Sequence, residues 1–343
     1  MDLAPFLAGS GPFLADLEAT SGGVRKLNTP TIILLSVVLG SLAIAFAVGH
    51  ILRRQPDSSV NPAVLASFHR RVRAWWLMSA TLLAAFIIPG KWATTTLFGL
   101  LGFWALREFI TLTPTRLGDH RALFWVFFLI TPLQFVLVGL GSQFYFFYSI
   151  MIPVFALPFI PARIALAGDH KRFLERTAKI QAAVLVCVYS LSFVPALLYL
   201  DDWIDWKGST AGLLFYFVVI AQLSEVFQMV WDHLIGQRVA AEDISASKTW
   251  EGLGGNLACS AIAGAALFWV TPFDFWQSAL MAVVIALMGF GGSLTMSAIK
   301  RDRGVTDYGT LVEGHPGVLD RMDTICFAAP VFYQLTRILF TEI

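Results

Sequence analysis

Long apolar runs separated by short polar connections dominate the chain. A helix that crosses the hydrocarbon core of a bilayer needs roughly 20 apolar residues. Runs of about this length occur near residues 31–52, 74–90, 93–112, 122–141, 143–161, 180–200, 210–231, 253–271, 276–298 and 324–342. They lack the alternation of a membrane β-barrel, and a backbone in lipid must satisfy its own hydrogen bonds. The pattern therefore predicts an all-α, polytopic integral membrane protein with about ten transmembrane helices.

Composition supports a membrane location. Of the 343 residues, 57% are hydrophobic and 14% are charged, whereas a typical soluble protein has about 25% charged residues. The cysteines Cys187, Cys259 and Cys326 lie in separate apolar runs, which indicates packing and not a disulfide framework or a metal-spaced pair. The formal net charge of +1 identifies no partner, and no nucleic acid is expected among the partners.

Basic residues alternate between successive connections. The first, third, fifth, seventh and ninth connections carry the Lys and Arg clusters, such as Arg70, Arg71 and Arg73 in the first, while the even connections are poor in excess positive charge. Because cytoplasmic loops retain Lys and Arg, this alternation predicts that both termini lie outside the cytoplasm; only Arg25 and Lys26 disagree. We therefore expect an outside segment, 1–30, followed by N-terminal helices in 31–200. The remaining region, 201–343, would carry the chemistry on its cytosolic loops 232–252 and 300–323.

The first of these two loops ends in a run of hydroxyl and charged residues. Ser245, Lys248, Thr249, Glu251 and Gly252 directly precede an apolar run rich in small residues. Backbone N–H groups and the dipole at a helix N-terminus favour phosphate, so this segment could be an anion cradle. A helix cap combined with a positive membrane anchor explains the same residues equally well.

The second loop combines paired acids with paired bases. Asp320 and Asp323 are three residues apart and share one face of a helix, where two carboxylates could hold a divalent metal against a phosphate. Lys300 and Arg301 offer positive charge to a polyphosphate. The simpler alternative is an ordinary basic loop in which the acids pair with the bases.

Elsewhere, Arg107 and Glu108 either pair with each other or point at an active-site cavity.

Both loops resemble motifs of one known family, the phosphatidate cytidylyltransferases. The C-terminal motif is matched in order and spacing by Ser297, Lys300, Arg301, Asp307, Gly309, Leu311, Gly314, His315, Gly317, Asp320, Arg321 and Asp323. The upstream motif of the family resembles Ser245 together with residues 248–252. The two motifs cover about the last third of the chain.

The resemblance implies attack of a lipid phosphate on the α-phosphorus of CTP, with release of pyrophosphate. It implies catalytic roles for Lys300, Arg301, Asp307, His315 and Arg321, and substrate binding by Ser245, Lys248, Thr249, Glu251 and Ser297. Mg²⁺, with or without a second cation, would be held by Asp320 and Asp323. The expected partners are CTP, phosphatidate or a related lipid phosphate, and membrane lipids. The expected location is the bacterial cytoplasmic membrane with the active site facing the cytosol.

Several residues depart from the family pattern. Thr306, Glu313 and Pro316 replace a lysine, a proline and a glycine. Ser293 stands where the family has a metal-binding aspartate, which indicates a divergent branch. Glu225, Asp232 or both are candidates for the missing carboxylate, because an acid within an apolar span is a functional candidate. In the alternative, Asp232 caps a helix end and Glu225 is neutral or hydrogen-bonded to Gln222 or Gln228, residues within the same apolar run.

Two other functions remain open from sequence. One is a CTP-dependent kinase for a polyprenol-type alcohol, since such kinases are distantly similar. The other is a catalytically silent membrane paralogue or transporter, which Ser293 and Thr306 favour and the retained Lys300, Asp320 and Asp323 disfavour. Small residues at 254–264 and at Gly289, Gly291 and Gly292 predict close helix packing, with a homodimer interface as one use of it.

Overall fold

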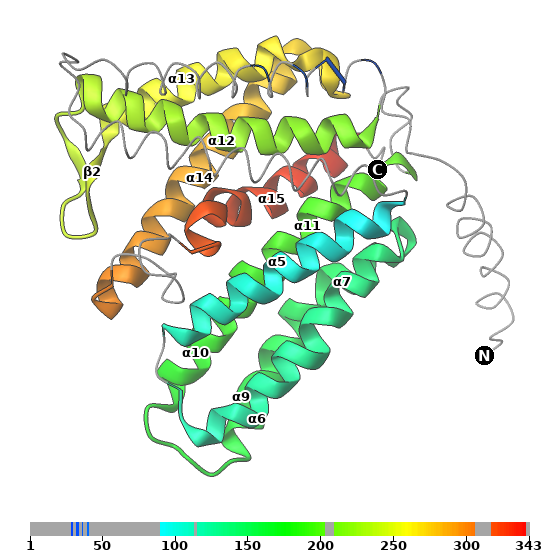
Figure 1. Cartoon of the computed structure of the whole chain (residues 1–343), viewed down its shortest axis with the longest axis vertical. Coiled ribbons are helices and arrows are strands. Elements are labelled where there is room, and N and C mark those ends of the chain that lie inside the picture. The colour runs from blue at the N-terminus through cyan, green and yellow to red at the C-terminus, as the bar shows by residue number, and fades with distance from the viewer. Residues whose placement is uncertain are drawn as a thin grey trace, which may run out of the picture. The chain divides into compact units, whose positions relative to one another are not determined.

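The computed structural model describes residues 90–112, 115–202, 209–305 and 317–340, together with isolated helical positions between 29 and 40. The chain divides into two compact units, Met1–Thr94 and Thr95–Ile343, and nearly all of the described residues belong to the second unit. The described part of this unit is helical except for one antiparallel hairpin (Figure 1).

The elements follow one another as helices interrupted by irregular turns. They are α5 (Lys91–Thr111), α6 (Leu117–Trp125), η1 (Val126–Ile130), α7 (Thr131–Gly139), η2 (Ser142–Phe144), α8 (Tyr145–Ile150), η3 (Met151–Ala156), α9 (Leu157–Ala165), α10 (Phe173–Val184), η4 (Leu185–Ser190), α11 (Leu191–Ala196), η5 (Leu197–Asp202), α12 (Thr210–Ile235), β1 (Val239–Ala241), β2 (Ser245–Thr249), α13 (Trp250–Ala266), η6 (Phe268–Val270), α14 (Phe275–Arg303) and α15 (Leu319–Phe340).

Prolines accompany the irregular turns inside the long helices. The π-helical turn η1 directly precedes Thr131 and Pro132, and η3 contains Pro153. Proline lacks an N–H donor, so nearby carbonyls need other partners. Just before the first proline, the carbonyl of Val126 accepts both the backbone N–H of Thr131 and its hydroxyl, the latter at 2.8 Å. The π-helical bond keeps the helix continuous up to the proline in lipid, where water cannot satisfy the backbone.

The membrane class predicted from the apolar runs is confirmed. Within the described residues, five segments are long and apolar enough to span a membrane: Leu117–Gly139, Ser142–Ala165, Phe173–Leu200, Thr210–Ile235 and Phe275–Arg303. Together with α5, α13 and α15 they match the eight predicted spans from residue 93 onward. The predicted spans 31–52 and 74–90 lie outside the described residues apart from isolated positions, so the total of ten stays a prediction.

The C-terminal helices α12, α13, α14 and α15 pack closely through small residues. A side chain at Gly264 would overlap Ala282, and one at Gly289 would press on Thr324. The hydroxyl of Ser278 also donates to the carbonyl of Gly264, at 2.7 Å. Small residues let helix backbones approach in this way. These glycines therefore have packing partners within the chain, and the homodimer stays a prediction.

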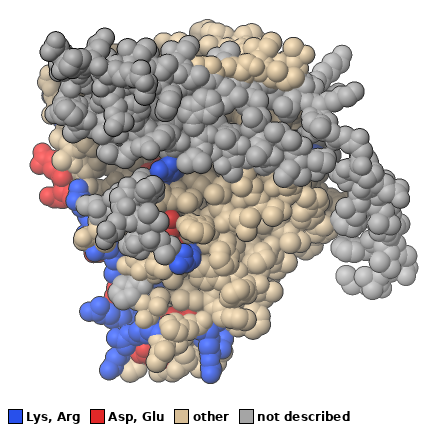
Figure 2. Space-filling view, in the orientation of Figure 1, with Lys and Arg blue, Asp and Glu red and all other residues tan. Residues whose placement is uncertain are grey.

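The polar connections gather at one end of the unit. Figure 2 shows Lys and Arg concentrated where the starts of α6 and α10 and the end of α14 lie in Figure 1. The exposed bases that belong to these segments are Arg116, Arg121, Lys171, Arg172 and Arg301. An ion pair of 3.7 Å between Arg303 and Glu175 joins the end of α14 to the start of α10. The third, fifth and ninth connections thus share one end, as their common basic character predicts.

Candidate active site at the ends of α12, α14 and α15

The hairpin places the first motif against the end of α12. Thr249 is the N-cap of α13, where its hydroxyl accepts the N–H of Gly252 at 3.0 Å. The backbone N–H and the hydroxyl of Thr249 both donate to Oδ1 of Asp232, at 2.9 and 2.7 Å. Gly252 lies so close that any side chain there would overlap the Asp232 carboxylate. Asp232 therefore fixes the start of α13.

A chain of buried polar groups continues from Asp232 between α12 and α13. Gln228 donates to Asp232 at 2.9 Å and accepts from Asn256 at 3.3 Å, and Ser260 donates to Asn256 at 3.0 Å. Each buried amide thus has a partner, which limits its desolvation cost. The geometry fits the alternative in which Asp232 caps a helix end, and metal binding by Asp232 stays a prediction.

Glu251 has a comparable structural contact. Its carboxylate accepts the backbone N–H groups of Arg238, at 3.0 Å, and of Gln237, at 3.3 Å. The hydrogen bond from the backbone of Arg238 is the main cause that lowers the pKa of Glu251. Thr249 and Glu251 hold the hairpin in place, so any contact of theirs with substrate stays a prediction.

Lys248 brings the first motif to the second. It lies on β2 between Ser247 and Thr249, with its ammonium 5.3 Å from the centre of the Phe290 ring of α14. Burial is the main influence on its pKa and lowers it, because the charged form loses hydration. The charged groups that interact with its ammonium are Asp323, Glu225, Asp232 and Lys300. A lysine from the hairpin thus sits among acids of α12 and α15.

The second motif faces this lysine from α14 and α15. The ammonium of Lys300 donates to Oδ1 of Asp320 at 2.9 Å. One turn further on, the carboxylate of Asp323 accepts the N–H of Thr324 at 2.7 Å and a hydrogen bond from the hydroxyl of Ser293. Both acids therefore turn toward polar groups of α14, as their three-residue spacing predicts.

The remaining predicted site residues lie around this centre or outside the described residues. Arg301 is exposed and donates to the carbonyl of Ile244 in the hairpin, at 3.3 Å. Ser297 donates to the carbonyl of Ser293 on its own helix, at 2.7 Å. Arg321 interacts with Asp320, and Ser245 begins β2. Asp307 and His315 fall outside the described residues.

Glu108, which the sequence predicts either to pair with Arg107 or to point at an active-site cavity, is a buried acid beside the site. Glu108 of α5 accepts the backbone N–H groups of Val318 and Leu319 at the start of α15, at 3.0 and 2.9 Å. The guanidinium of its neighbour Arg107 lies 5.7 Å from the ring centre of Trp104. An acid in an apolar run was the only sequence signal for Glu108, because its partners are about 210 positions away.

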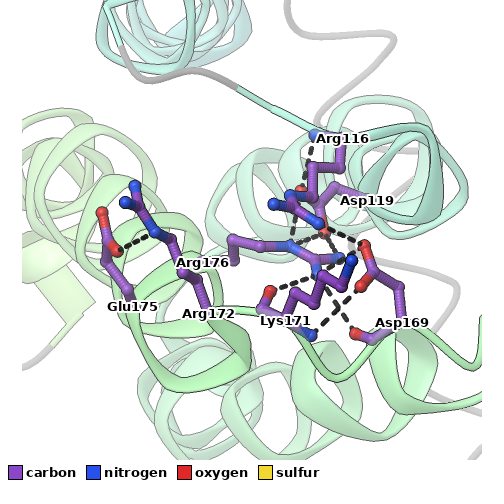
Figure 3. Close-up of polar contacts among 7 residues, drawn as sticks. All are labelled: Arg116, Asp119, Asp169, Lys171, Arg172, Glu175 and Arg176. Carbon is purple, nitrogen blue, oxygen red and sulfur yellow. Dashed lines mark hydrogen bonds and ion pairs between the residues drawn. The ribbon is translucent and has the colours of Figure 1, made fainter.

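A separate ion-pair cluster stabilises the same end of the molecule. Figure 3 shows the guanidinium of Arg176 between Asp119 and Asp169, and Arg116 alongside. Arg176 is 5% exposed and Asp119 is 1% exposed. Arg176 donates to both carboxylate oxygens of Asp119 and to the carbonyls of Asp169 and Lys171. With its donors used in this way, the cluster ties α6 to α10 and has a structural role.

The donor set around Lys248 suits a hard divalent cation. Glu225, Asp232, Asp323 and Lys300 interact with Lys248, and Lys300 pairs in turn with Asp320. Carboxylate oxygens are ligands for Mg²⁺, which usually takes one or two of them together with phosphates and water. Among the described residues no three His, Cys, Asp or Glu side chains are close enough to hold a metal alone. The residues present fit a cation shared with a phosphate substrate.

Fold and site together define an integral membrane protein with a charged, phosphate-compatible centre at the ends of its helices. A family model described as the cytidylyltransferase family matches residues 69–339. The chain belongs to this family and is thus a nucleotidyltransferase, as the two sequence motifs indicate.

The curated proteins similar to this chain include two kinds. The chain is 32% identical to the "Uncharacterized protein YnbB" of Escherichia coli K12 over 269 residues, which cover 78% of this chain and 86% of that protein. It is 32% identical to a phosphatidate cytidylyltransferase of Synechocystis over 143 residues, 40% of this chain and 48% of that enzyme. For the Mycobacterium leprae enzyme the identity is 31% over 184 residues, 52% and 55% of the two chains. The chain thus spans about half of these enzymes, which agrees with a divergent branch.

Proposed function

We propose that the protein transfers the cytidylyl group of CTP to phosphatidate or a related lipid phosphate, at the cytosolic face of a bacterial inner membrane. The observation that carries this proposal is the meeting of the two motifs. Arg301 of the second motif donates to the carbonyl of Ile244 in the hairpin at 3.3 Å, and Lys248 of the hairpin interacts with Asp323, 75 positions away in sequence.

The reaction needs charge neutralisation more than proton transfer. An oxygen of the lipid phosphate forms a bond to the α-phosphorus of CTP, the bond from that phosphorus to the bridging oxygen breaks, and pyrophosphate leaves with the electron pair. The attacking phosphate is already ionised, so no general base is required. Lys248, Lys300 and Arg301 would bind and orient the phosphates, and such positioning carries most of the catalysis in phosphoryl-type transfers.

Mg²⁺, when bound, would neutralise phosphate charge and hold the α-phosphate for attack. Asp320 and Asp323 are its proposed ligands, with Glu225 as a further carboxylate near Lys248. Lys300 is bonded to Asp320 in the structure. Its ammonium has three N–H donors, so it could hold Asp320 and a phosphate oxygen at the same time.

The site lies at helix ends, where a water-soluble substrate and a membrane lipid can both reach it. Lys300 and Arg301 are in the last turn of α14, and Asp320 is in the first turn of α15. Helix ends lie at headgroup level when the helices span the bilayer. CTP can then arrive from water while the lipid phosphate stays at the interface.

Labelled CTP tests the proposal directly. Purified protein in detergent with Mg²⁺ and phosphatidate should incorporate label from the α-phosphate of CTP into lipid, and Asp320→Asn should lose this activity. Label from the γ-phosphate alone would instead support a lipid kinase acting on an alcohol. No CDP-lipid from a panel of lipid phosphates would overturn the proposal in favour of a catalytically silent paralogue.

A further inference from the structure

Glu108 is a buried carboxylate that belongs to neither sequence motif. It lies in the last turn of α5 and is 6% exposed. Burying a charge is costly unless hydrogen bonds compensate it. Hydrogen bonds compensate this cost for Glu108. They come from the start of α15, the helix that carries Asp320 and Asp323.

Both carboxylate oxygens of Glu108 bind the start of α15. Oε1 accepts the N–H of Val318 at 3.0 Å, and Oε2 accepts the N–H of Leu319 at 2.9 Å. The indole N–H of Trp104, one turn earlier on α5, donates to Oε1 at 3.0 Å and fixes the carboxylate. A charged acceptor at a helix N-terminus satisfies orphan N–H groups and complements the dipole.

The local sequence cannot supply this cap itself. Helix starts are usually capped by a Ser, Thr, Asp or Asn side chain directly before the helix. Here Gly317 and Val318 precede Leu319, and neither has a side-chain acceptor. Glu108 therefore provides from another helix the acceptor that α15 lacks, and the two helices are joined at this point.

We propose that Glu108 is a positioning residue that fixes the start of α15 and thereby the metal-binding geometry of Asp320 and Asp323. This inference rests on the proposed function. Asp320 follows Leu319 directly and Asp323 is one turn further, so a shift of the helix start moves both carboxylates relative to α14. Displacements of about 1 Å at a reacting centre can cost about 100-fold in rate.

Glu108→Gln is the sharpest variant because it keeps the side-chain length. Its amide group would oppose one of the two backbone N–H groups, donor against donor. We expect kcat/KM for CTP to fall roughly 10- to 100-fold and the Mg²⁺ concentration for half-saturation to rise several-fold. Trp104→Phe keeps an aromatic ring beside Arg107 but removes the hydrogen bond to the Glu108 carboxylate, and it should raise that Mg²⁺ concentration by a smaller factor.

Asp119→Asn is the matched control. Asp119 is also a buried carboxylate near a helix start, where it accepts the N–H of Arg116 at 2.9 Å. Its partners belong to the cluster at α6 and α10. The Asp119→Asn variant should have a lower melting temperature in detergent and an unchanged Mg²⁺ concentration for half-saturation. Equal Mg²⁺ profiles in wild type and Glu108→Gln would overturn the positioning role.

A second readout does not depend on turnover. Mg²⁺ that binds only the folded protein raises its melting temperature in a concentration-dependent way. The wild type and Asp119→Asn should show this shift at similar Mg²⁺ concentrations, Glu108→Gln should need more, and Asp320→Asn should not show it. If Glu108→Gln does not fold, Trp104→Phe decides, and an unchanged Mg²⁺ profile there contradicts the inference. Absence of CDP-lipid in the wild type would overturn the proposed function, while the melting shifts would still test Glu108.

Discussion

Replacing Lys248 tests how the two motifs cooperate. Lys248→Met keeps an apolar chain against Phe290 and removes the charge. A hydrogen bond to a charged group contributes about 1.5–3 kcal/mol, so kcat/KM for CTP should fall roughly 10- to 150-fold. The same change removes a cation from among Asp323, Glu225 and Asp232. Mg²⁺ should therefore half-saturate the variant at a lower concentration than the wild type.

The pH dependence of kcat/KM separates the contribution of the Lys248 charge from that of its side-chain shape. Burial lowers the pKa of Lys248, so its ammonium is lost below the ordinary lysine value of about 10.4. The kcat/KM of the wild type, which reports the free enzyme, should decline with rising pH before that value. Lys248→Arg keeps its charge throughout and stacks well on an aromatic ring, so its profile should lack this decline.

Stability should change with pH in the opposite direction. The pKa of Lys248 is lower in the folded protein than in the unfolded chain. Between these two pKa values the unfolded chain binds more protons than the folded protein, so the free energy of unfolding rises with pH there. The assay is kcat/KM for CTP at saturating lipid, together with melting temperature, from neutral pH to about pH 10.4. Identical alkaline declines in wild type and Lys248→Arg would refute this role of Lys248.

Three further predictions concern the scaffold of the site. Glu251→Gln should lower the melting temperature at neutral pH; because hydrogen bonding depresses the pKa of Glu251, its contribution is complete above the ordinary value of about 4.3 and is lost as pH falls through the folded value. A difference from wild type that persists unchanged in acid would contradict this. Gly252→Ala should destabilise by about 1–3 kcal/mol by overlapping Asp232. Gly254→Ala should be tolerated, because among the described residues an added methyl there meets no atom within 4 Å outside its own helix backbone. Equal melting temperatures of the two variants would show the contact to be unimportant. Asp119→Asn leaves its arginine partner buried without its main counter-ion and should cost about 3–5 kcal/mol in denaturant unfolding, and an unchanged midpoint would disprove the structural role of the cluster.

The helices were the most predictable part of the fold. Eight apolar runs from residue 93 onward correspond to eight helical segments, because lipid leaves the backbone few alternatives to the helix. Their ends were less predictable. Helix α12 continues to Ile235 and α14 to Arg303, beyond the apolar runs that predicted them. Polar residues can extend a helix out of the bilayer, where hydropathy no longer reports it.

The hairpin could not be predicted from its sequence. Its strands have three and five residues, and they lack the alternation of apolar and polar positions that indicates a strand. The sequence also left Thr249 undecided between a phosphate cradle and a cap. The capping contact with Gly252 and the bonds to Asp232 depend on how α12 meets α13, which local sequence does not contain.

The contacts divide the polar residues of the site into two sets, one that holds the hairpin and one that carries a partly buried charge. Asp232, Thr249 and Glu251 are held by backbone and side-chain partners that keep the hairpin in place. The charge of Lys248 is instead partly buried and lowers the stability of the fold, as the lowered pKa of Lys248 indicates. Replacing this lysine with an apolar residue should therefore raise stability. The proposed cytidylyl transfer gives the partly buried ammonium near Asp323 and Lys300 a use, because it would bind phosphate.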